Sequence, residues 1–212
     1  MKTKARSIQQ IVEEQARRWE MMRNEKKKEA ADLPVITISR EPGSGGKVVA
    51  EKLAEKLRAD LFHQHIINKM SESTQASRLI LETLDEKGLT ILEDWISSMV
   101  FDRHLWPDEY LKHLMKVIGT IGRHGRAIIV GRGANFILPQ EKCFRVRIIA
   151  PLSIRVRNVA KEHGASEDEC MRRISRSESE RSAFVRKEKN FGCLVIVPSM
   201  SKPTTIAFPF QS

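Results

Sequence analysis

The chain has few of the residues that mark extracellular, metal-binding or nucleic-acid-stacking proteins. Its 212 residues include one tyrosine, and aromatic residues make up only 6% of the total. The three cysteines, Cys143, Cys170 and Cys193, are odd in number and far apart. Because this spacing matches neither a disulfide framework nor a metal site, we expect reduced thiols in structural positions and no protein-bound metal.

Long apolar runs are also missing. No stretch approaches the ~20 residues that a membrane-spanning helix needs, and the charged N-terminus lacks the apolar core of a secretory signal. We therefore expect a cytoplasmic protein without a membrane partner. The length allows one sizeable α/β domain with appendages, and the 41% of hydrophobic residues is enough for a real core.

Positive charge is what the chain has in excess. The formal net charge is +10, and the cations concentrate in residues 1–30 and 142–189. The second segment is rich in arginine, whose planar fork matches pairs of phosphate oxygens. This predicts a polyphosphate ligand, with a solvated helix face as the alternative. The scarcity of aromatic residues does not favour a nucleic-acid partner.

Short apolar runs rich in β-branched residues alternate with helical patterns. The expected strands are residues 35–39, 60–62, 127–131, 144–150 and 193–197. The expected helices are residues 6–30, 47–57, 152–163 and 166 to about 187, with an interrupted helical region at 65–122. This alternation predicts a doubly wound parallel sheet with helices on both faces and a helical insertion between the second and third strands.

Apolar positions predict how the helices pack. In helix 6–30 one face carries Ile8, Ile11, Val12, Trp19 and Met22. This stripe predicts docking on the body of the protein, on a partner or on a second copy. The inward positions expected in helix 47–57 are Val48, Val49, Leu53 and Leu57. The expected breaks in the helical region are Gly88, Pro107 and Gly119.

The stretch "VITISREPGSGGKVVAEKL" (35–53) joins a strand to a helix through a glycine-rich loop. Backbone N–H groups and the positive end of a helix dipole meet at such a junction, and together they bind phosphate. Gly43, Gly45 and Gly46 permit close approach of the backbone, and the Ser44 hydroxyl is a further donor. The alternative interpretation is an ordinary tight turn.

Two further features carry arginine. In "IIVGRGANF" (128–136) a strand runs into a loop that places Arg132 at the carboxyl edge of the sheet, where open α/β sheets bind ligands. The segment "RRISRSESERSAFVRK" (172–187) repeats arginine at helical intervals. It predicts a mobile basic lid that neutralises transferring phosphates, or else an exposed helix held by ion pairs to Glu178 and Glu180.

The chain resembles the cytidylate kinase-like family of P-loop nucleoside monophosphate kinases. The resemblance rests on "ITISREPGSGG", "DEKGLTILEDWIS", "HGRAIIVGRGANFILP" and "RVRIIAPLSIRV", and covers roughly residues 8–187. It implies the three-layer P-loop NTPase fold with a helical insertion that binds the monophosphate and a basic lid. It also implies ATP with Mg²⁺ as phosphoryl donor and a pyrimidine monophosphate, CMP or dCMP, as acceptor.

The resemblance also assigns residues to roles. It places the donor phosphates on the loop from Arg40 to Lys47. The residues implied to bind the acceptor are Arg132, Asn135 and His63. The residues implied to be catalytic are Lys47 and the lid arginines Arg176, Arg181 and Arg186. Arg155 matches the first arginine after the fourth strand, near the base of the lid.

The loop departs from the usual pattern of the family. Where ordinary cytidylate kinases end the loop with Gly-Lys-Gly-Thr, this chain has Gly45, Gly46, Lys47 and Val48. The lysine therefore follows one position late, and no hydroxyl stands at the position that ligates Mg²⁺. Either Lys47 curls back toward the phosphates, or Arg40 substitutes for it. The sequence leaves both open.

The expected organisation is an N-terminal amphipathic helix (1–33), a cytidylate kinase-like domain (34–190) and an atypical C-terminal tail with a candidate last strand (191–212). Two functions follow from different classes. The first is a nucleoside monophosphate kinase, since phosphoryl transfer needs positioning and charge neutralisation more than covalent chemistry. The second is a catalytically weak or inactive phospho-ligand-binding sensor or interaction module that uses the same loop.

Overall fold

A computed structural model describes residues 8–25, 35–102, 109–185, 194–198 and 203–206. The chain divides into two compact units. The helical unit comprises Met1–Pro34 and Phe62–Ala127, and the sheet unit comprises Val35–Leu61 and Ile128–Ser212. Within the described ranges, no helix is both long and apolar enough to cross a membrane.

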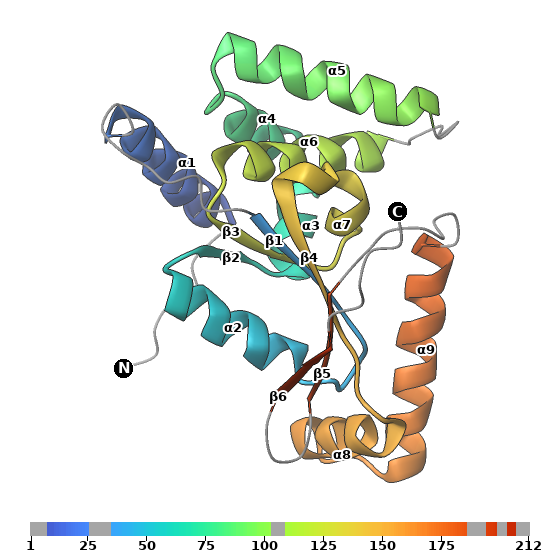
Figure 1. Ribbon diagram of the computed structural model, residues 1–212. Coiled ribbons are helices and arrows are strands. Elements are labelled where there is room, and N and C mark those ends of the chain that lie inside the picture. The colour runs from blue at the N-terminus through green and yellow to red at the C-terminus, as the bar shows by residue number, and fades with distance from the viewer. Residues whose placement is uncertain (1–7, 26–34, 103–108, 186–193, 199–202, 207–212) are drawn as a thin grey trace. The chain divides into compact units, whose positions relative to one another are not determined.

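The described residues form one six-stranded sheet (Figure 1). Its strands are β1 (Val35–Arg40), β2 (Asp60–Phe62), β3 (Ala127–Val130), β4 (Cys143–Ile148), β5 (Leu194–Pro198) and β6 (Pro203–Ile206). Their order is β2-β3-β1-β4-β5-β6. The register pairs Ile36 with Ile128 and Phe144, and β1, β3, β4 and β5 run parallel. This confirms the predicted α/β class and the five predicted strands, while the antiparallel edge strand β6 was not predicted.

Helix α2 (Gly46–Leu57) covers one face of the sheet. Ala50 and Ala54 are buried against the branched side chains of β1, β3 and β4, with Val49 and Leu53 packed at the margin of this cluster. The prediction that Val48 points inward was wrong, because Val48 is 52% exposed. The helix turns its alanines toward the sheet instead, since small side chains let the two backbones approach closely.

The opposite face carries polar as well as apolar groups. Side chains alternate along a strand, so Arg145 projects away from the cluster that holds Val146. Arg145 is buried, and its Nη2 donates to the carbonyl oxygen of Leu138 at 2.9 Å. Leu138 follows the short helix α7 (Ala134–Ile137), so helical segments lie on both faces of the sheet, as predicted.

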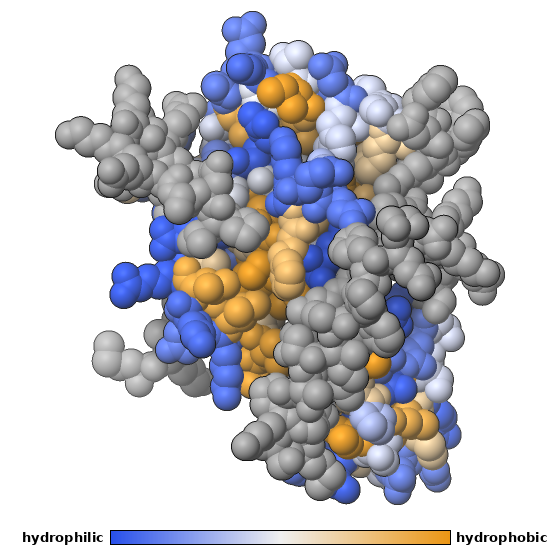
Figure 2. Space-filling view, viewed as in Figure 1, coloured by the Kyte–Doolittle hydropathy of each residue, from blue (hydrophilic) through white to orange (hydrophobic). Residues whose placement is uncertain are grey.

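Two helices follow β4 and pack against each other. Helices α8 (Leu152–His163) and α9 (Glu167–Val185) bury a small cluster between them that includes the free thiol of Cys170. The Glu169 N–H bonds the Ser166 hydroxyl at 3.4 Å, which confirms the predicted start of α9. In Figure 2, hydrophobic side chains reach the surface between hydrophilic ones where these helices lie; the large exposed ones are Leu152 and Met171.

The helical unit is built around one buried helix. Its elements are α1 (Ile8–Glu25), α3 (Gln64–Glu72), α4 (Thr74–Leu81), α5 (Glu86–Asp102) and α6 (Glu109–His124). Leu114, Ile118 and Ile121 of α6 are completely buried. Helix α1 packs on α3 and α4, and its Trp19 ring stacks on His124 with centroids 4.2 Å apart. The predicted apolar stripe of α1 is therefore covered within this unit at Val12 and Trp19.

Two of the three predicted helix breaks were wrong. Gly119 lies inside α6, where a Cβ would collide with the Leu92 side chain of α5, so this glycine allows close helix packing. Gly88 lies in the first turn of α5, where its N–H bonds the Asp85 carboxylate at 2.8 Å. Pro107 lies outside the described residues.

Candidate functional site

The glycine-rich loop connects the carboxyl end of β1 to the first turn of α2. Gly43 and Gly45 adopt left-handed backbone conformations, with φ of 76° and 79°. Ser44 between them is buried, and its Oγ donates to the carbonyl oxygen of Glu41 at 2.8 Å. The predicted strand, loop and helix are therefore present, with the helix N-terminus directly at the loop.

The glycines of this loop meet different surroundings. A Cβ added at Gly43 would lie 2.5 Å from the carbonyl oxygen of Arg155, so the backbone of α8 fills the place of a side chain. A Cβ added at Gly45 would have no atom of the described residues within 4 Å. Gly43 is therefore required by packing, whereas Gly45 borders open space among the described residues at the start of α2.

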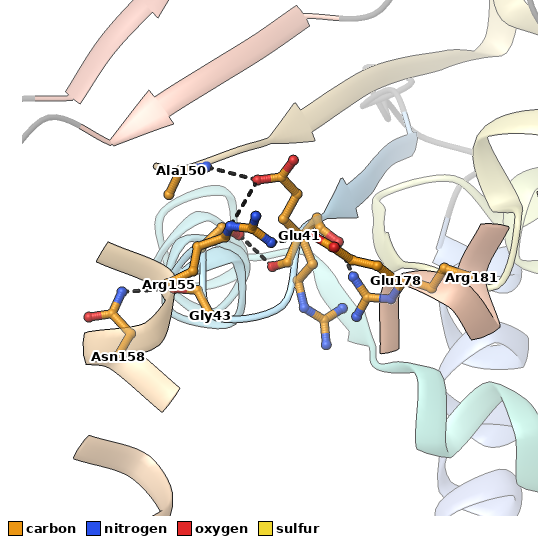
Figure 3. Close-up of polar contacts among 9 residues, drawn as sticks. Glu41, Gly43, Ala150, Arg155, Asn158, Glu178 and Arg181 are labelled. Atoms are coloured by element: carbon orange, nitrogen blue, oxygen red, sulfur yellow. Dashed lines mark hydrogen bonds and ion pairs between the residues drawn. The ribbon is translucent and has the colours of Figure 1, made fainter. Parts of the chain in front are cut away.

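Side chains of α8 and α9 hold the loop in place (Figure 3). Asn158 Nδ2 donates to the carbonyl oxygen of Gly43 at 2.8 Å, and the Glu41 carboxylate accepts from the Ala150 N–H at 3.1 Å. Arg155 lies between two carboxylates: its Nε is 3.5 Å from Glu41, and its Nη1 pairs with Glu178. This network ties the loop to both helices that follow β4.

Arg181 of α9 reaches back to the start of the loop, where its Nη1 donates to the carbonyl oxygen of Arg40. Burial lowers the pKa of both guanidiniums. The pKa of Arg181 is lowered further by the nearby positive charges of Arg40 and Arg132, against which Glu178 acts. The positive charges of Arg40 and Arg132, from two other segments, therefore both act on Arg181, and this arrangement favours an anionic ligand.

The loop after β3 is left-handed over three residues in succession. Gly131, Arg132 and Gly133 have φ of 80°, 54° and 65°. The Gly131 N–H donates to the carbonyl oxygen of Ile38 at 3.0 Å, which fixes this loop to the end of β1. A left-handed arginine is uncommon and costs conformational energy, so the surrounding structure imposes this conformation. Asn135, on α7, is half-buried as Arg132 is.

The remaining predicted site residues lie elsewhere. Lys47 is exposed in the first turn of α2, and Arg176 is exposed on α9, where its Nε bonds Glu180 at 3.0 Å. The ion pair predicted for Glu180 therefore forms, with Arg176, whereas Glu178 pairs with Arg155 of α8 instead of an arginine of its own helix. His63 precedes α3 in the helical unit. Arg186 lies outside the described residues.

Sequence reasoning missed Glu41 and Asn158 as groups that position the loop. The only available signal was Glu41 itself: a carboxylate inside a loop that is expected to bind anions indicates a structural role. Within the part of the chain that the structure describes, no cluster of three or more His, Cys, Asp or Glu side chains could hold a metal ion.

Comparison with known proteins gives consistent findings. The model of the cytidylate kinase-like family matches residues 35–191. A cytidylate kinase from Methanopyrus kandleri is 29% identical over 167 residues, which are 74% of this chain and 76% of that protein. An uncharacterised protein from Eubacterium ventriosum has a similar fold. Its TM-score is 0.55 at 18% identity, over 78% of this chain and 89% of that one.

Proposed function

Because the chain belongs to the cytidylate kinase-like family, we propose that it is a nucleoside monophosphate kinase that transfers the γ-phosphoryl group of ATP to a pyrimidine monophosphate, CMP or dCMP. The observation that carries this proposal is the convergence of Arg40, Arg132 and Arg181 beside a glycine-rich loop at a helix N-terminus. Phosphoryl transfer needs such positioning and charge neutralisation.

The loop after β1 binds the donor phosphates in this proposal. Its backbone N–H groups and the N-terminus of the 12-residue helix α2 supply partial positive charge without any particular side chain. The open space beside Gly45 admits the phosphates. Asn158 and Glu41 act as positioning residues, because Asn158 donates to the Gly43 carbonyl oxygen and Glu41 accepts from the Ala150 N–H.

The loop after β3 binds the acceptor phosphate. The guanidinium of Arg132 grips two oxygens of the monophosphate and fixes the oxygen that attacks ATP. Asn135 and His63 are proposed to contact the acceptor as well. Of the lid arginines, Arg181 is already at the donor loop, whereas Arg176 would have to leave Glu180 to take part. Arg186 completes the proposed set of lid arginines.

Side chains of the donor loop offer no ready ligand for magnesium. Val48 has no hydroxyl, the Ser44 hydroxyl is bonded to Glu41, and the Glu41 carboxylate accepts from Ala150. The loop therefore does not fit a protein-built Mg²⁺ site. We expect the ion to arrive with the nucleotide phosphates and to keep several waters, as Mg²⁺ commonly does.

A coupled assay for ADP formation tests the proposal. Purified protein is given MgATP and each of a panel of nucleoside monophosphates. The expected result is turnover with CMP or dCMP above the rates with UMP, AMP and GMP. If calorimetry shows binding of ATP and a monophosphate but no ADP forms, the protein is a phospho-ligand-binding sensor and not a kinase. The lack of a magnesium ligand in the loop favours this alternative. If neither binds, both functions are wrong.

Arg132→Lys tests the assignment of the acceptor site. Lysine keeps the charge but loses the planar fork, so we expect a loss of about 10-fold or more in kcat/KM for the monophosphate. Affinity for ATP should barely change, because the donor lies at the other loop. Calorimetry with each ligand separates the two. Equal loss of both ligands, or of neither, contradicts the assignment.

The organisation of the chain into three segments is also part of the proposal. Residues 1–33 would form an N-terminal amphipathic helix, residues 34–190 would carry the cytidylate kinase-like domain, and residues 191–212 would form an atypical C-terminal tail with a last strand.

A further inference from the structure

The first residue of α2 is a glycine, so it has no side chain to offer the loop. Gly46 opens this helix and is buried, while Lys47 is the next residue and is exposed. Side chains of successive helical residues point about 100° apart. The side chain of Lys47 therefore projects in a different direction from the one that a side chain at residue 46 would take. Residue 46, where the usual pattern of the family has the lysine, is therefore a glycine, and it is nevertheless buried.

The side chain of Arg40 is what buries Gly46. A Cβ added at Gly46 would lie 2.7 Å from Cδ and 2.8 Å from Cβ of Arg40. The aliphatic stem of Arg40 therefore crosses the start of α2 at the point where residue 46 would carry its own side chain. Gly46 does not have a positive φ, so backbone conformation does not explain why glycine stands here. The space taken by Arg40 does.

Among the described residues, no carboxylate forms a salt bridge with Arg40. The charge of Glu162 only partly opposes the lowering of the Arg40 pKa by burial. Arg40 is half-buried, and its positive charge acts on Arg181. A partly buried cation that faces a second cation is costly unless an anion joins them.

We propose that Arg40 supplies the side-chain cation of the donor-phosphate loop in place of a lysine on α2, and that residue 46 is glycine to let Arg40 cross it. This inference rests on the proposed binding of ATP by the loop. It resolves the two alternatives that the sequence left open in favour of Arg40. Arg181 then holds the backbone of the same residue whose side chain meets the phosphates.

A matched pair of variants tests which cation acts. Arg40→Met keeps an unbranched apolar stem over Gly46 and removes the charge. Lys47→Met makes the same kind of change, an unbranched apolar side chain in place of a cation, at the residue after Gly46. Binding of MgATP is measured by calorimetry. We expect Arg40→Met to weaken binding about 10- to 100-fold, as for loss of hydrogen bonds to a charged group, and Lys47→Met to weaken it by about 5-fold at most.

A double-mutant cycle tests the steric half of the proposal. Gly46→Ala puts a methyl group into the stem of Arg40, although alanine is favoured over glycine in a helix. We expect about a 10-fold loss of ATP affinity from Gly46→Ala in the natural background and less than about a 2-fold further loss in the Arg40→Ala background. Melting curves of each variant establish that the fold is retained.

The outcomes separate this inference from the proposed function. If the natural protein does not bind MgATP, the proposed function fails, and the inference fails with it. If the natural protein binds but Arg40→Met binds equally well, only the inference is wrong. If Lys47→Met alone abolishes binding, Lys47 is the cation. Independent effects of Gly46→Ala and Arg40→Ala would overturn the claim that glycine makes room for arginine.

Discussion

The loops after β1 and β3 both depend on left-handed backbone, but they use it differently. In the first loop the left-handed residues are glycines, and Gly43 is pressed against the backbone of Arg155. In the second loop Arg132 itself is left-handed, and a Cβ at Gly131 would meet no atom within 4 Å in the part of the chain that the structure describes. The first loop is fixed by what packs around it, whereas the second holds a residue other than glycine in a strained backbone conformation.

This difference fits a division between donor and acceptor sites. In the proposed donor loop the backbone borders open space at Gly45, and helix α8 holds the loop through Arg155 and Asn158. In the proposed acceptor loop the guanidinium of Arg132 would orient one phosphate, and Arg132 itself has a left-handed backbone conformation. The proposed functions of the loops therefore make different demands on the same local geometry.

Gly43→Ala should have the largest effect on stability. The new Cβ meets the carbonyl oxygen of Arg155, and the residue must keep a φ of 76°. Overpacking and left-handed strain together should lower the free energy of unfolding by about 2–4 kcal/mol. Gly45→Ala is the matched control, since it has the same φ but open space around it, and it should lose only about 1–2 kcal/mol. Urea denaturation measures the free energy of unfolding of both variants. Equal losses would contradict the claim that Gly43 is tightly packed and Gly45 is not.

Gly45→Val should affect binding more than folding. The branched side chain enters the space that the proposal gives to the phosphates. We expect ATP binding to become undetectable, at least about 100-fold weaker, while circular dichroism stays close to that of the natural protein. Gly131→Val is the counterpart in the other loop and should impair the monophosphate instead. Unchanged ATP affinity in Gly45→Val would reduce the first loop to a tight turn.

Arg181→Ala and Arg176→Ala compare two arginines on one helix. Arg181 contacts the loop, so its removal should lower kcat about 100-fold and raise KM much less, because charge neutralisation strengthens in the transition state. Arg176 is exposed and paired with Glu180, so Arg176→Ala should cost no more than about 0.5 kcal/mol of stability and change kcat little. Equal losses of kcat would show that both arginines close over the phosphates.

Much of the fold was readable because it depends on short-range patterns. The strands are apolar and β-branched, and the helix Leu152–His163 was predicted with its observed ends. The strand order confirms the α/β fold, and the matching family model confirms the family. What failed depends on contacts distant in sequence: Gly119 looked like a helix break because its partner Leu92 is not visible from local sequence.

The site was predicted in outline for the same reason. The glycine loop and Arg132 follow strands and are marked by local sequence, so their positions at strand ends were expected. The role of Glu41 requires the Ala150 N–H and the guanidinium of Arg155, both more than a hundred residues away. The contest between Arg40 and Lys47 likewise depends on the direction of side chains at the start of α2, which spacing alone does not give.

The smallest expected effect is a gain in stability, and it bears on the second loop. Arg132→Gly removes a side chain from a left-handed position that glycine adopts readily. Relief of strain of about 1–2 kcal/mol is partly offset by the greater chain entropy of glycine, so we expect the unfolding free energy to rise by about 0.5 kcal/mol. The monophosphate should no longer bind measurably.

Arg58→Gly is the control, since Arg58 is also left-handed, at the end of α2. Arg58→Gly should give a similar gain in urea denaturation with kcat unchanged. A loss of stability in Arg132→Gly alone would mean that contacts of Arg132 in the folded protein outweigh its strain, and the second loop would then be fixed by packing as the first is.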